Sequence, residues 1–208
     1  PEVPGEPPAD VALVQLATQH AAAEALASHA LLLAGQWADQ QGRVEDALRH
    51  YDRLVAQYPR GPLLDDGLMA AAQLLLRLSR SAQAVARLEQ LVATYRSAMI
   101  VGHYNRLLLG DGTLLLGEVY LRDLHQPEQA LTTLRKLLVR QPTSRLCDDA
   151  LVLMAEAVQQ RRPNLSPADR VEACGYVERV LRDFPDSNRR RQATQLRAQL
   201  RCPGAPVS

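Results

Sequence analysis

The stretch Leu32–Pro59, LLAGQWADQQGRVEDALRHYDRLVAQYP, holds an apolar segment with a small residue, a turn at Gly42, a second apolar segment and a closing Tyr-Pro pair. Three later stretches repeat this order. The small residue is Gly35, Ala72, Gly117 or Ala155. An early alanine of the second segment is Ala47, Ala84, Ala130 or Ala173. The closing pair is Tyr58-Pro59, Tyr95-Arg96, Gln141-Pro142 or Phe184-Pro185.

The second segment of each copy has the apolar spacing of an amphipathic helix. In Val44–Tyr58, apolar residues such as Ala47, Leu48 and Tyr51 follow the i, i+3, i+4, i+7 pattern. Proline ends such a helix because it lacks the backbone donor and forces the preceding residue out of helical geometry. Each helix pair has an apolar face too large to bury alone, so neighbouring pairs must stack on it.

The pattern predicts an all-α protein, a right-handed α-solenoid of about four helix-turn-helix repeats with flanking helices. Asp10 is expected to be the N-cap of the first helix, and a break near Ser28-His29 is expected to separate this helix from the first repeat. Within a superhelical domain at 28–202, the expected parts are repeats at about 28–61, 62–97, 103–143 and 144–186 and a terminal helix at 187–201. Outside it lie a Pro-rich tether at 1–9, a helix at 10–27 and a tail at 203–208.

Composition limits the possible functions. The 208 residues are 47% apolar but only 4% aromatic, so the core must be built from Ala, Leu and Val. The net charge of +1 argues against an extended nucleic-acid interface. Two basic clusters, Arg161-Arg162 and Arg189–Arg191, are interpreted as solvated helix ends, and an anionic partner or lipid headgroup is the alternative.

These residues resemble the tetratricopeptide repeat, whose pattern has a small residue in the first helix, alanine early in the second and a closing proline. The first copy has Gly35, Ala47 and Pro59 in the expected phase, and the resemblance extends over about Ser28–Arg201. The second copy departs from the pattern, because Arg96 replaces the closing proline. The phrases Tyr-Pro…Asp-Asp-Gly-Leu and Phe-Pro-Asp-Ser are similar to the bacterial envelope subclass, which includes lipoproteins of outer-membrane assembly and Tol-Pal coordination.

No pattern in the chain points to catalysis. The five histidines, His20, His29, His50, His103 and His125, form no i, i+3 or i, i+4 pair that would favour a helical metal site. Phosphate-loop, nucleophile-elbow and zinc-protease motifs are absent from the sequence. We therefore expect a non-enzymatic protein with no cofactor, no metal and no small-molecule substrate.

Three cysteines allow two interpretations. Cys174 lies on the penultimate expected helix and Cys202 just beyond the last one, and the two helices should be antiparallel. A Cys174–Cys202 disulfide requires the chain to bend back after Leu200, and it would staple the last helix in an oxidising compartment. The alternative is a pair of reduced, packed thiols. Cys147 occupies the place of Leu64 in the repeat, so it is expected to be a packing residue.

A partner-binding surface follows from the phase of the repeats. In arrays of this kind the concave wall is lined by the first helix of each repeat. One column of equivalent positions there contains Gln36, Gln73, Glu118 and Glu156. A second column, four residues further along each helix, contains Gln40, Arg77, Arg122 and Gln160. We expect these side chains to bind an extended peptide, and simple solvated helix faces are the alternative.

The expected function is a protein-interaction scaffold that binds a peptide or subunit of a bacterial cell-envelope complex. The expected location is the periplasm. A segment before Pro1 is expected to tether the protein to the outer membrane. The alternatives are a cytoplasmic adaptor, an accessory helical domain of a larger envelope enzyme, and an anion or nucleic-acid binder through Arg189–Arg191. The full-length gene would discriminate, because a neighbouring catalytic domain supports the enzyme alternative and a lipidation signal supports the envelope.

Overall fold

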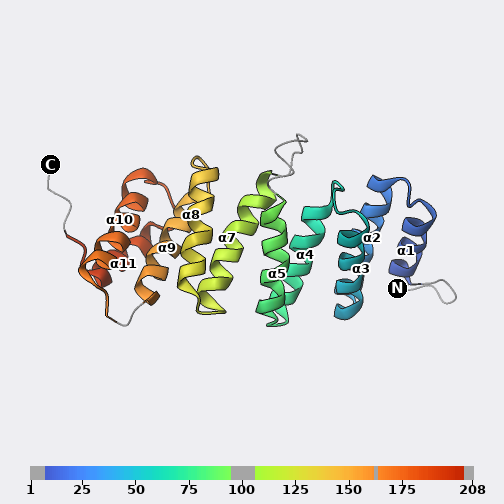
Figure 1. The fold of residues 1–208 in the computed structure, drawn as a ribbon, viewed down its shortest axis with the longest axis horizontal. Helices are drawn as coiled ribbons and strands as arrows, with labels where there is room; N and C mark the ends of the chain where they lie inside the picture. The colour runs from blue at the N-terminus through green and yellow to red at the C-terminus, as the bar shows by residue number, and fades with distance from the viewer. Residues whose placement is uncertain (1–7, 95–105, 162–163, 204–208) are drawn as a thin grey trace. The chain divides into compact units, whose positions relative to one another are not determined.

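A computed structural model describes residues 8–94, 106–161 and 164–203, and all regular structure in these ranges is helical. The chain divides into two compact units, Pro1–Leu109 and Gly110–Ser208. The N-terminal unit contains α1 (Ala9–Gln19), α2 (Glu24–Gln40), α3 (Val44–Gln57), α4 (Leu64–Arg77) and α5 (Ser81–Ala93). The C-terminal unit contains most of α7 (Arg106–Arg122), together with α8 (Pro127–Arg140), α9 (Cys147–Arg161), α10 (Pro167–Asp183) and α11 (Arg190–Leu200) (Figure 1). Helix α7 begins just before the boundary of this unit.

Helices that are consecutive in the chain pack against each other. In the N-terminal unit this holds from α1 through to α5, and in the C-terminal unit from α8 through to α11. Alternate helices also meet, because α2 contacts α4 and α9 contacts α11. Each unit is therefore a stack of helical hairpins. The first helices of the hairpins are α2, α4, α7 and α9, and the second helices are α3, α5, α8 and α10.

The small residues of the first helices let the second helices approach closely. A Cβ atom added to Gly35 would lie 2.3 Å from the ring of Tyr51, and one added to Gly117 would lie 2.6 Å from Leu134. Tyr51 and Leu134 are 2% and 0% exposed. The early alanines of the second helices are also fully enclosed, namely Ala47, Ala84, Ala130 and Ala173. The repeated small residues are therefore packing positions.

Three of the four closing pairs make the same turn. Tyr58, Gln141 and Phe184 each cap a second helix, with φ between −125° and −135° and ψ between 60° and 66°. The proline that follows each of them excludes helical geometry at this position. The carbonyl oxygen of each residue accepts a hydrogen bond from the backbone N–H three residues on, and a new helix starts within the following turn. The fourth pair, Tyr95-Arg96, and the expected loop after it lie outside the described residues.

The expected break near Ser28-His29 is wrong. Helix α1 ends at Gln19, α2 begins at Glu24, and Ser28 is fully buried inside α2. The Ser28 hydroxyl donates to the carbonyl oxygen of Ala25 at 3.2 Å, so it is satisfied within the helix and does not interrupt it. The actual turn follows His20, which precedes Gly35 by 15 residues, close to the 14 residues by which Tyr58 precedes Ala72, but this turn carries neither glycine nor proline.

Asp10 is a buried ion-pair partner and not the expected N-cap. Helix α1 begins at Ala9 with Pro8 before it, and the Asp10 side chain is 3% exposed. Arg43 donates to both carboxylate oxygens, at 2.6 and 2.9 Å, and His50 Nε2 lies 3.4 Å from one of them. The hydrogen bonds from Arg43 hold the pKa of Asp10 below its usual value. Helix α1 therefore includes Ala9, the last residue of the expected tether. Residues 1–7 of that tether lie outside the described residues.

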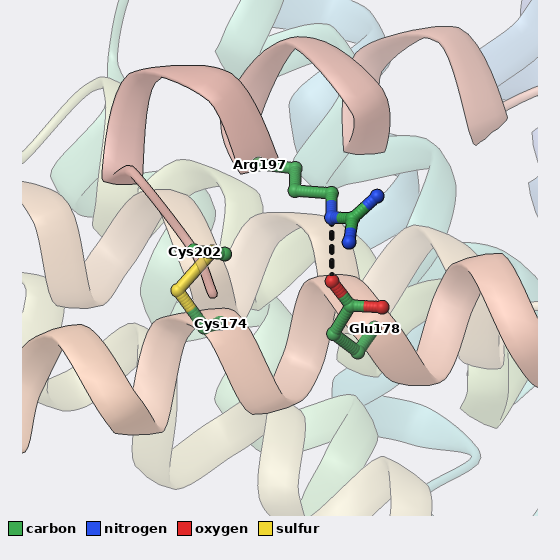
Figure 2. The surroundings of a disulfide bond; sticks show 4 residues. All are labelled: Cys174, Glu178, Arg197 and Cys202. Atoms are coloured by element: carbon green, nitrogen blue, oxygen red, sulfur yellow. Dashed lines mark ion pairs between the residues drawn. A yellow bond between two sulfur atoms is a disulfide. The ribbon is translucent and has the colours of Figure 1, made fainter. Parts of the chain in front are cut away.

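The last helix is attached through a disulfide bond. Helix α11 ends at Leu200 because Arg201 adopts the left-handed conformation, with φ 53° and ψ 48°. The chain thereby turns back and brings Cys202 to Cys174 on α10, with the two Cα atoms 5.5 Å apart (Figure 2). The ion pair between Arg197 and Glu178, at 2.7 Å, joins the same two helices. Residues 204–208 of the expected tail lie outside the described residues.

The third cysteine is a packing residue. Cys147 is 0% exposed at the start of α9, in the place that Leu64 takes in α4. Burial raises the pKa of its thiol, so the reactive thiolate is disfavoured. Its Sγ lies 3.3 Å from the carbonyl oxygen of Gln141, which gives the thiol a weak hydrogen bond.

A matched pair of glycine substitutions tests the packing. Gly117→Ala should destabilise the C-terminal unit by about 1–3 kcal/mol, because the added Cβ would lie 2.6 Å from the fully buried side chain of Leu134. Gly175→Ala makes the same change in α10, where nothing lies within 4 Å, and should stabilise it by about 0.5–1 kcal/mol through helix propensity. Urea unfolding followed by circular dichroism measures both, and two changes of the same sign would contradict the packing.

Thiol titration tests the disulfide. Unfolded, non-reduced protein should show one reactive thiol, Cys147, and reduced protein should show three. The bond closes a loop with a sequence separation of 28 residues, so reduction should cost roughly 3–4 kcal/mol of stability in the chain-entropy model. Three reactive thiols before reduction would show that the pair is not bonded.

Candidate partner-binding surface

The predicted binding residues lie on the solvent-facing side of the first helices, here termed the first-helix face. In the N-terminal unit this face contains Gln36 and Gln40 on α2 and Gln73 and Arg77 on α4, and all four are exposed. Each pair is spaced by four residues, so both side chains of a pair lie on one side of their helix. The structure thus presents these residues to solvent in adjacent helices of the same unit.

An ion pair joins the two helices at one end of this face. The Arg77 guanidinium donates to both carboxylate oxygens of Asp39, at 2.5 Å each. Arg77 is 61% exposed and Asp39 is 23% exposed, so the pair is well solvated and contributes little to stability. Asp39 was not among the predicted residues, although it directly precedes Gln40 and could have been found from that position.

In the C-terminal unit the predicted residues contact one another. Arg122 on α7 pairs with Glu118 one turn earlier at 2.5 Å and with Glu156 on α9 at 3.5 Å. Gln160, also on α9, lies 3.1 Å from the His125 ring nitrogen. The two carboxylates of this face therefore share one guanidinium, and the surface of α7 and α9 alternates in charge.

Helix α11 adds a residue that the sequence pattern did not single out. Gln192 donates from Nε2 to the Glu156 carboxylate at 2.6 Å. This contact arises because α11 stands next to α9, as α4 stands next to α2. The predicted terminal helix was not treated as a further first helix, and for this reason Gln192 was missed.

The basic cluster Arg189–Arg191 is largely used within the C-terminal unit. Arg189 pairs with Asp149 and also donates to Gln192 at 3.3 Å. Arg190 donates to the carbonyl oxygen of Leu181 at 2.8 Å, near the end of α10. Two of the three guanidinium groups thus hold α11 in place, which weakens the case for an anion site there.

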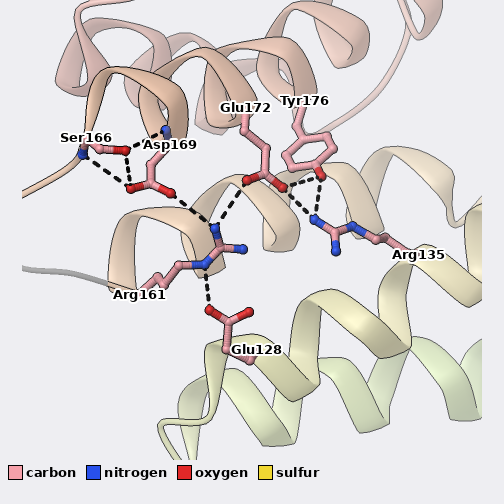
Figure 3. A network of polar contacts seen from close by, with 7 residues as sticks. All are labelled: Glu128, Arg135, Arg161, Ser166, Asp169, Glu172 and Tyr176. Atoms are coloured by element: carbon pink, nitrogen blue, oxygen red, sulfur yellow. Dashed lines mark hydrogen bonds and ion pairs between the residues drawn. The ribbon is translucent and has the colours of Figure 1, made fainter.

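A second polar cluster surrounds Arg161 at the end of α9 (Figure 3). Its guanidinium is 19% exposed and forms ion pairs with Glu128 of α8, at 2.7 Å, and with Asp169 and Glu172 of α10, at 3.1 and 3.3 Å. Glu172 also pairs with Arg135 at 2.6 Å and accepts a hydrogen bond from the Tyr176 hydroxyl at 2.9 Å. The cluster joins three consecutive helices, whereas Arg162 lies outside the described residues.

Asp169 also fixes the start of α10. The Ser166 hydroxyl accepts from the Asp169 backbone N–H at 3.1 Å, and the Asp169 carboxylate accepts from Ser166, which completes a capping box. The hydrogen bond from the Ser166 hydroxyl, followed by those from the Ser166 backbone and Arg161, holds the pKa of Asp169 below its usual value. Every carboxylate in the cluster forms an ion pair with an arginine, so the arrangement is a clamp between helices.

The described residues contain no group of His, Cys, Asp or Glu side chains that could hold a metal ion. In the same ranges, no helix has the length and apolar character needed to cross a membrane. The acid and basic side chains described above are engaged with one another. The geometry therefore identifies the first-helix face, with its row of exposed amide groups, as the best candidate for partner binding.

Stacked helical hairpins with small residues between them define the class of helical-repeat proteins. The family model of the tetratricopeptide repeat matches residues 29–60 and 112–144, which cover most of α2 and of α7 and all of α3 and α8. The chain therefore contains tetratricopeptide repeats, and this confirms the resemblance seen in its sequence.

Two curated relatives are similar to part of the chain. Both are described as outer membrane protein assembly factor BamD, from Xylella fastidiosa strains Temecula1 and 9a5c. Each is 28% identical over 138 residues, which span 62% of this chain and 45% of the relative. The chain thus matches less than half the length of these relatives.

Two solved structures share the fold. One is MamA, with a TM-score of 0.52, 14% identity and coverage of 95% of this chain and 98% of MamA. The other is BtubC from P. vanneervenii, with a TM-score of 0.50, 13% identity and coverage of 96% and 92%. Together with the repeat matches, they confirm an all-α helical solenoid, the fold of protein-interaction scaffolds.

Arg161→Met tests the clamp. Removal of the guanidinium leaves three carboxylates close together, so we expect the Tm to fall by roughly 4–8 °C at pH 7. The folded-state pKa of Asp169 is lowered, so its contribution is present above its unfolded pKa of about 3.9 and is lost as the pH falls through the folded value. The difference between variant and wild type should therefore shrink below about pH 4.

Arg182→Met is the matched control for this experiment. Arg182 is 73% exposed and contacts Asp183, its neighbour in the chain. Its replacement should change the Tm by less than about 2 °C. Equal effects of the two substitutions at pH 7, measured by differential scanning calorimetry, would show that Arg161 is not a clamp.

Proposed function

We propose that the chain is a non-enzymatic scaffold that binds a peptide or subunit of a bacterial cell-envelope complex along its first-helix face. The observation that carries this proposal is the recurrence, within each unit, of exposed or half-buried polar side chains at equivalent positions of the first helices. Gln36, Gln40 and Gln73 each offer an amide donor and an amide acceptor to solvent. This combination suits the backbone of an extended peptide, which presents N–H and C=O groups in alternation.

The two units offer different chemistry to such a partner. The N-terminal part of the face is mainly neutral amide, with Arg77 and Asp39 at one end. The C-terminal part carries Arg122 between Glu118 and Glu156. A partner that supplies a carboxylate near Arg77 or Arg122 would gain an ion pair, and it would compete with the internal acids for the same guanidinium group.

The proposed location is the periplasmic side of the cell envelope, and a link to the outer membrane remains a prediction. Two observations support it. The Cys174–Cys202 disulfide would persist in an oxidising compartment such as the bacterial periplasm. The similarity to an outer membrane protein assembly factor points to the same compartment. Absence of a catalytic role, of a cofactor and of a nucleic-acid partner likewise remains a prediction.

Charge reversal on the first-helix face tests the proposal. Arg77→Glu and Arg122→Glu should weaken partner binding at least about ten-fold, the loss expected when a charged contact becomes repulsive. Because both side chains are well exposed, the Tm should change by less than about 3 °C. The measurement is affinity capture from an envelope extract with quantitative mass spectrometry, followed by titration of the retained protein.

The controls separate position from charge. Arg49→Glu and Arg182→Glu make the same change on the second helices α3 and α10, at side chains that are each 73% exposed. Arg122→Gln removes the charge without adding repulsion toward Glu118 and Glu156. Binding that is unchanged by Arg77→Glu and Arg122→Glu, or reduced equally by the controls, would contradict the assignment of this face.

A further inference from the structure

Helix α11 has little tendency to form on its own. It has 11 residues, and isolated helices shorter than about 12–15 residues are marginal in water. Its N-cap residue, Arg189, makes no side-chain capping hydrogen bond. Arg190 and Arg191 follow in the first turn, where the helix dipole disfavours positive charge. The helix therefore depends on its contacts with α9 and α10.

A small apolar contact and the disulfide hold α11 against its neighbours. Ala193, Leu196 and Leu200 are 0–5% exposed, and they are the buried side chains of this helix. Cys202 lies two residues beyond the end of α11 and is bonded to Cys174 of α10 (Figure 2). The covalent link keeps α11 close to its docking surface, so it opposes the loss of this small contact.

The docked helix places donors and positive charge beside acidic side chains of the C-terminal unit. Gln192 donates to Oε1 of Glu156 at 2.6 Å, and Arg189 pairs with Asp149. The hydrogen bond with Asp149 raises the pKa of Arg189, and the charge of Glu118 on α7 contributes to this increase. Docking of α11 therefore affects acids on both α7 and α9.

Glu156 connects α11 to the first-helix face. Its Oε1 accepts the hydrogen bond from Gln192, and its Oε2 lies 3.5 Å from Arg122. Arg122 pairs more closely with Glu118, at 2.5 Å, and it remains 48% exposed. With α11 docked, Glu156 contacts Arg122 through one oxygen only, and the guanidinium group can bind a carboxylate of a partner.

Undocking of α11 would change the charge around Arg122. Glu156 would lose the donor to its Oε1 and would be free to turn both oxygens toward Arg122, the bidentate geometry that arginine and carboxylates favour. The positive charge of Arg189 would also leave Asp149 and Glu118. Arg122 would then be less available to a partner carboxylate, and its surroundings would be more negative.

We propose that the Cys174–Cys202 disulfide is a redox switch for the C-terminal part of the first-helix face. Oxidation fixes α11, which holds one oxygen of Glu156 away from Arg122 and leaves this guanidinium group available to a carboxylate of the partner. The reduced chain binds the same partner more weakly. This inference rests on the proposed function, because it concerns regulation of the same face.

The switch is a thiol–disulfide exchange with a disulfide oxidant. Cys202 is half-buried and Cys174 is 5% exposed, so Cys202 is the more accessible thiol. Its thiolate attacks one sulfur of the oxidant and displaces the other as a thiolate. The Cys174 thiolate then attacks the Cys202 sulfur, which forms the intramolecular bond and releases the second thiolate. The two electrons and the two protons of the cysteines end on the oxidant, which becomes two thiols.

Hydrogen exchange with mass spectrometry tests whether the disulfide holds α11, using the full chain. Reduction with a phosphine, or Cys202→Ser, should speed exchange in α11 at least about ten-fold, because an undocked helix loses its backbone hydrogen bonds. Exchange in α3, which belongs to the N-terminal unit, should not change and is the internal control. Unchanged exchange in α11 would overturn the proposal, because docking would not depend on the disulfide.

Chemical modification tests whether α11 controls Arg122. The probe is phenylglyoxal, which reacts with guanidinium groups, and its rate at Arg122 should fall about two- to five-fold on reduction, the range of a solvated ion pair. Gln192→Met removes the donor to Glu156 and should lower the rate similarly in the oxidised chain. Gln195→Met makes the same change at an exposed position of α11 and should have no effect. A rate that is unchanged or higher after reduction would overturn the proposal.

Partner binding is the third measurement. A protein that the oxidised chain retains from an envelope extract should bind the reduced chain at least about three-fold more weakly, and re-oxidation should restore the affinity. Equal affinities of the two forms would overturn the proposal. If the oxidised chain retains no protein, the proposed function fails, whereas the exchange and modification measurements still decide whether α11 controls Arg122.

Discussion

The close approach of the two helices in each repeat is the constraint on which the rest of the structure depends. Gly35 leaves space for the ring of Tyr51, and Gly117 leaves space for the side chain of Leu134. The early alanines of the second helices are fully buried. A chain with so few aromatic residues obtains a dense core only if its backbones come close together, since many small contacts must replace a few large ones. Once the hairpins are packed in this way, the polar side of each first helix faces solvent, and the candidate partner-binding surface is this side.

Ion pairs between consecutive repeats complement this packing. Arg77 joins Asp39 across α2 and α4, and Arg161 joins carboxylates on α8 and α10. The Arg161 side chain is mostly buried, so its ion pairs constrain how the helices around it pack. The Arg77–Asp39 pair is solvated, so Arg77 can exchange Asp39 for another partner at little cost in free energy. Polar contacts in this protein thus divide into mostly buried pairs that hold helices together and solvated pairs that contribute little to stability.

The sequence predicted the hairpins because their signals are local. Small residues, early alanines and closing prolines act within one repeat, so Gly35, Ala47 and Pro59 could be read in order along the chain. The turn at His20–Ala23 was missed because a run of alanines carries no local stop signal, and its position follows from stacking on the next repeat. Partners such as Asp39 and Gln192 were missed for a related reason, since they depend on which helices become neighbours in space.

The disulfide at the end of α11 has a kinetic consequence. Terminal helices of repeat arrays have neighbours on one side only and are the usual places where fraying begins. A covalent link from Cys202 to α10 keeps a detached α11 at high effective concentration beside its docking surface, which favours its return over a loss of contacts. The link therefore protects α11 against fraying, and we expect a protease that acts on transiently opened segments to cleave α11 more slowly when the disulfide is intact than when it is reduced.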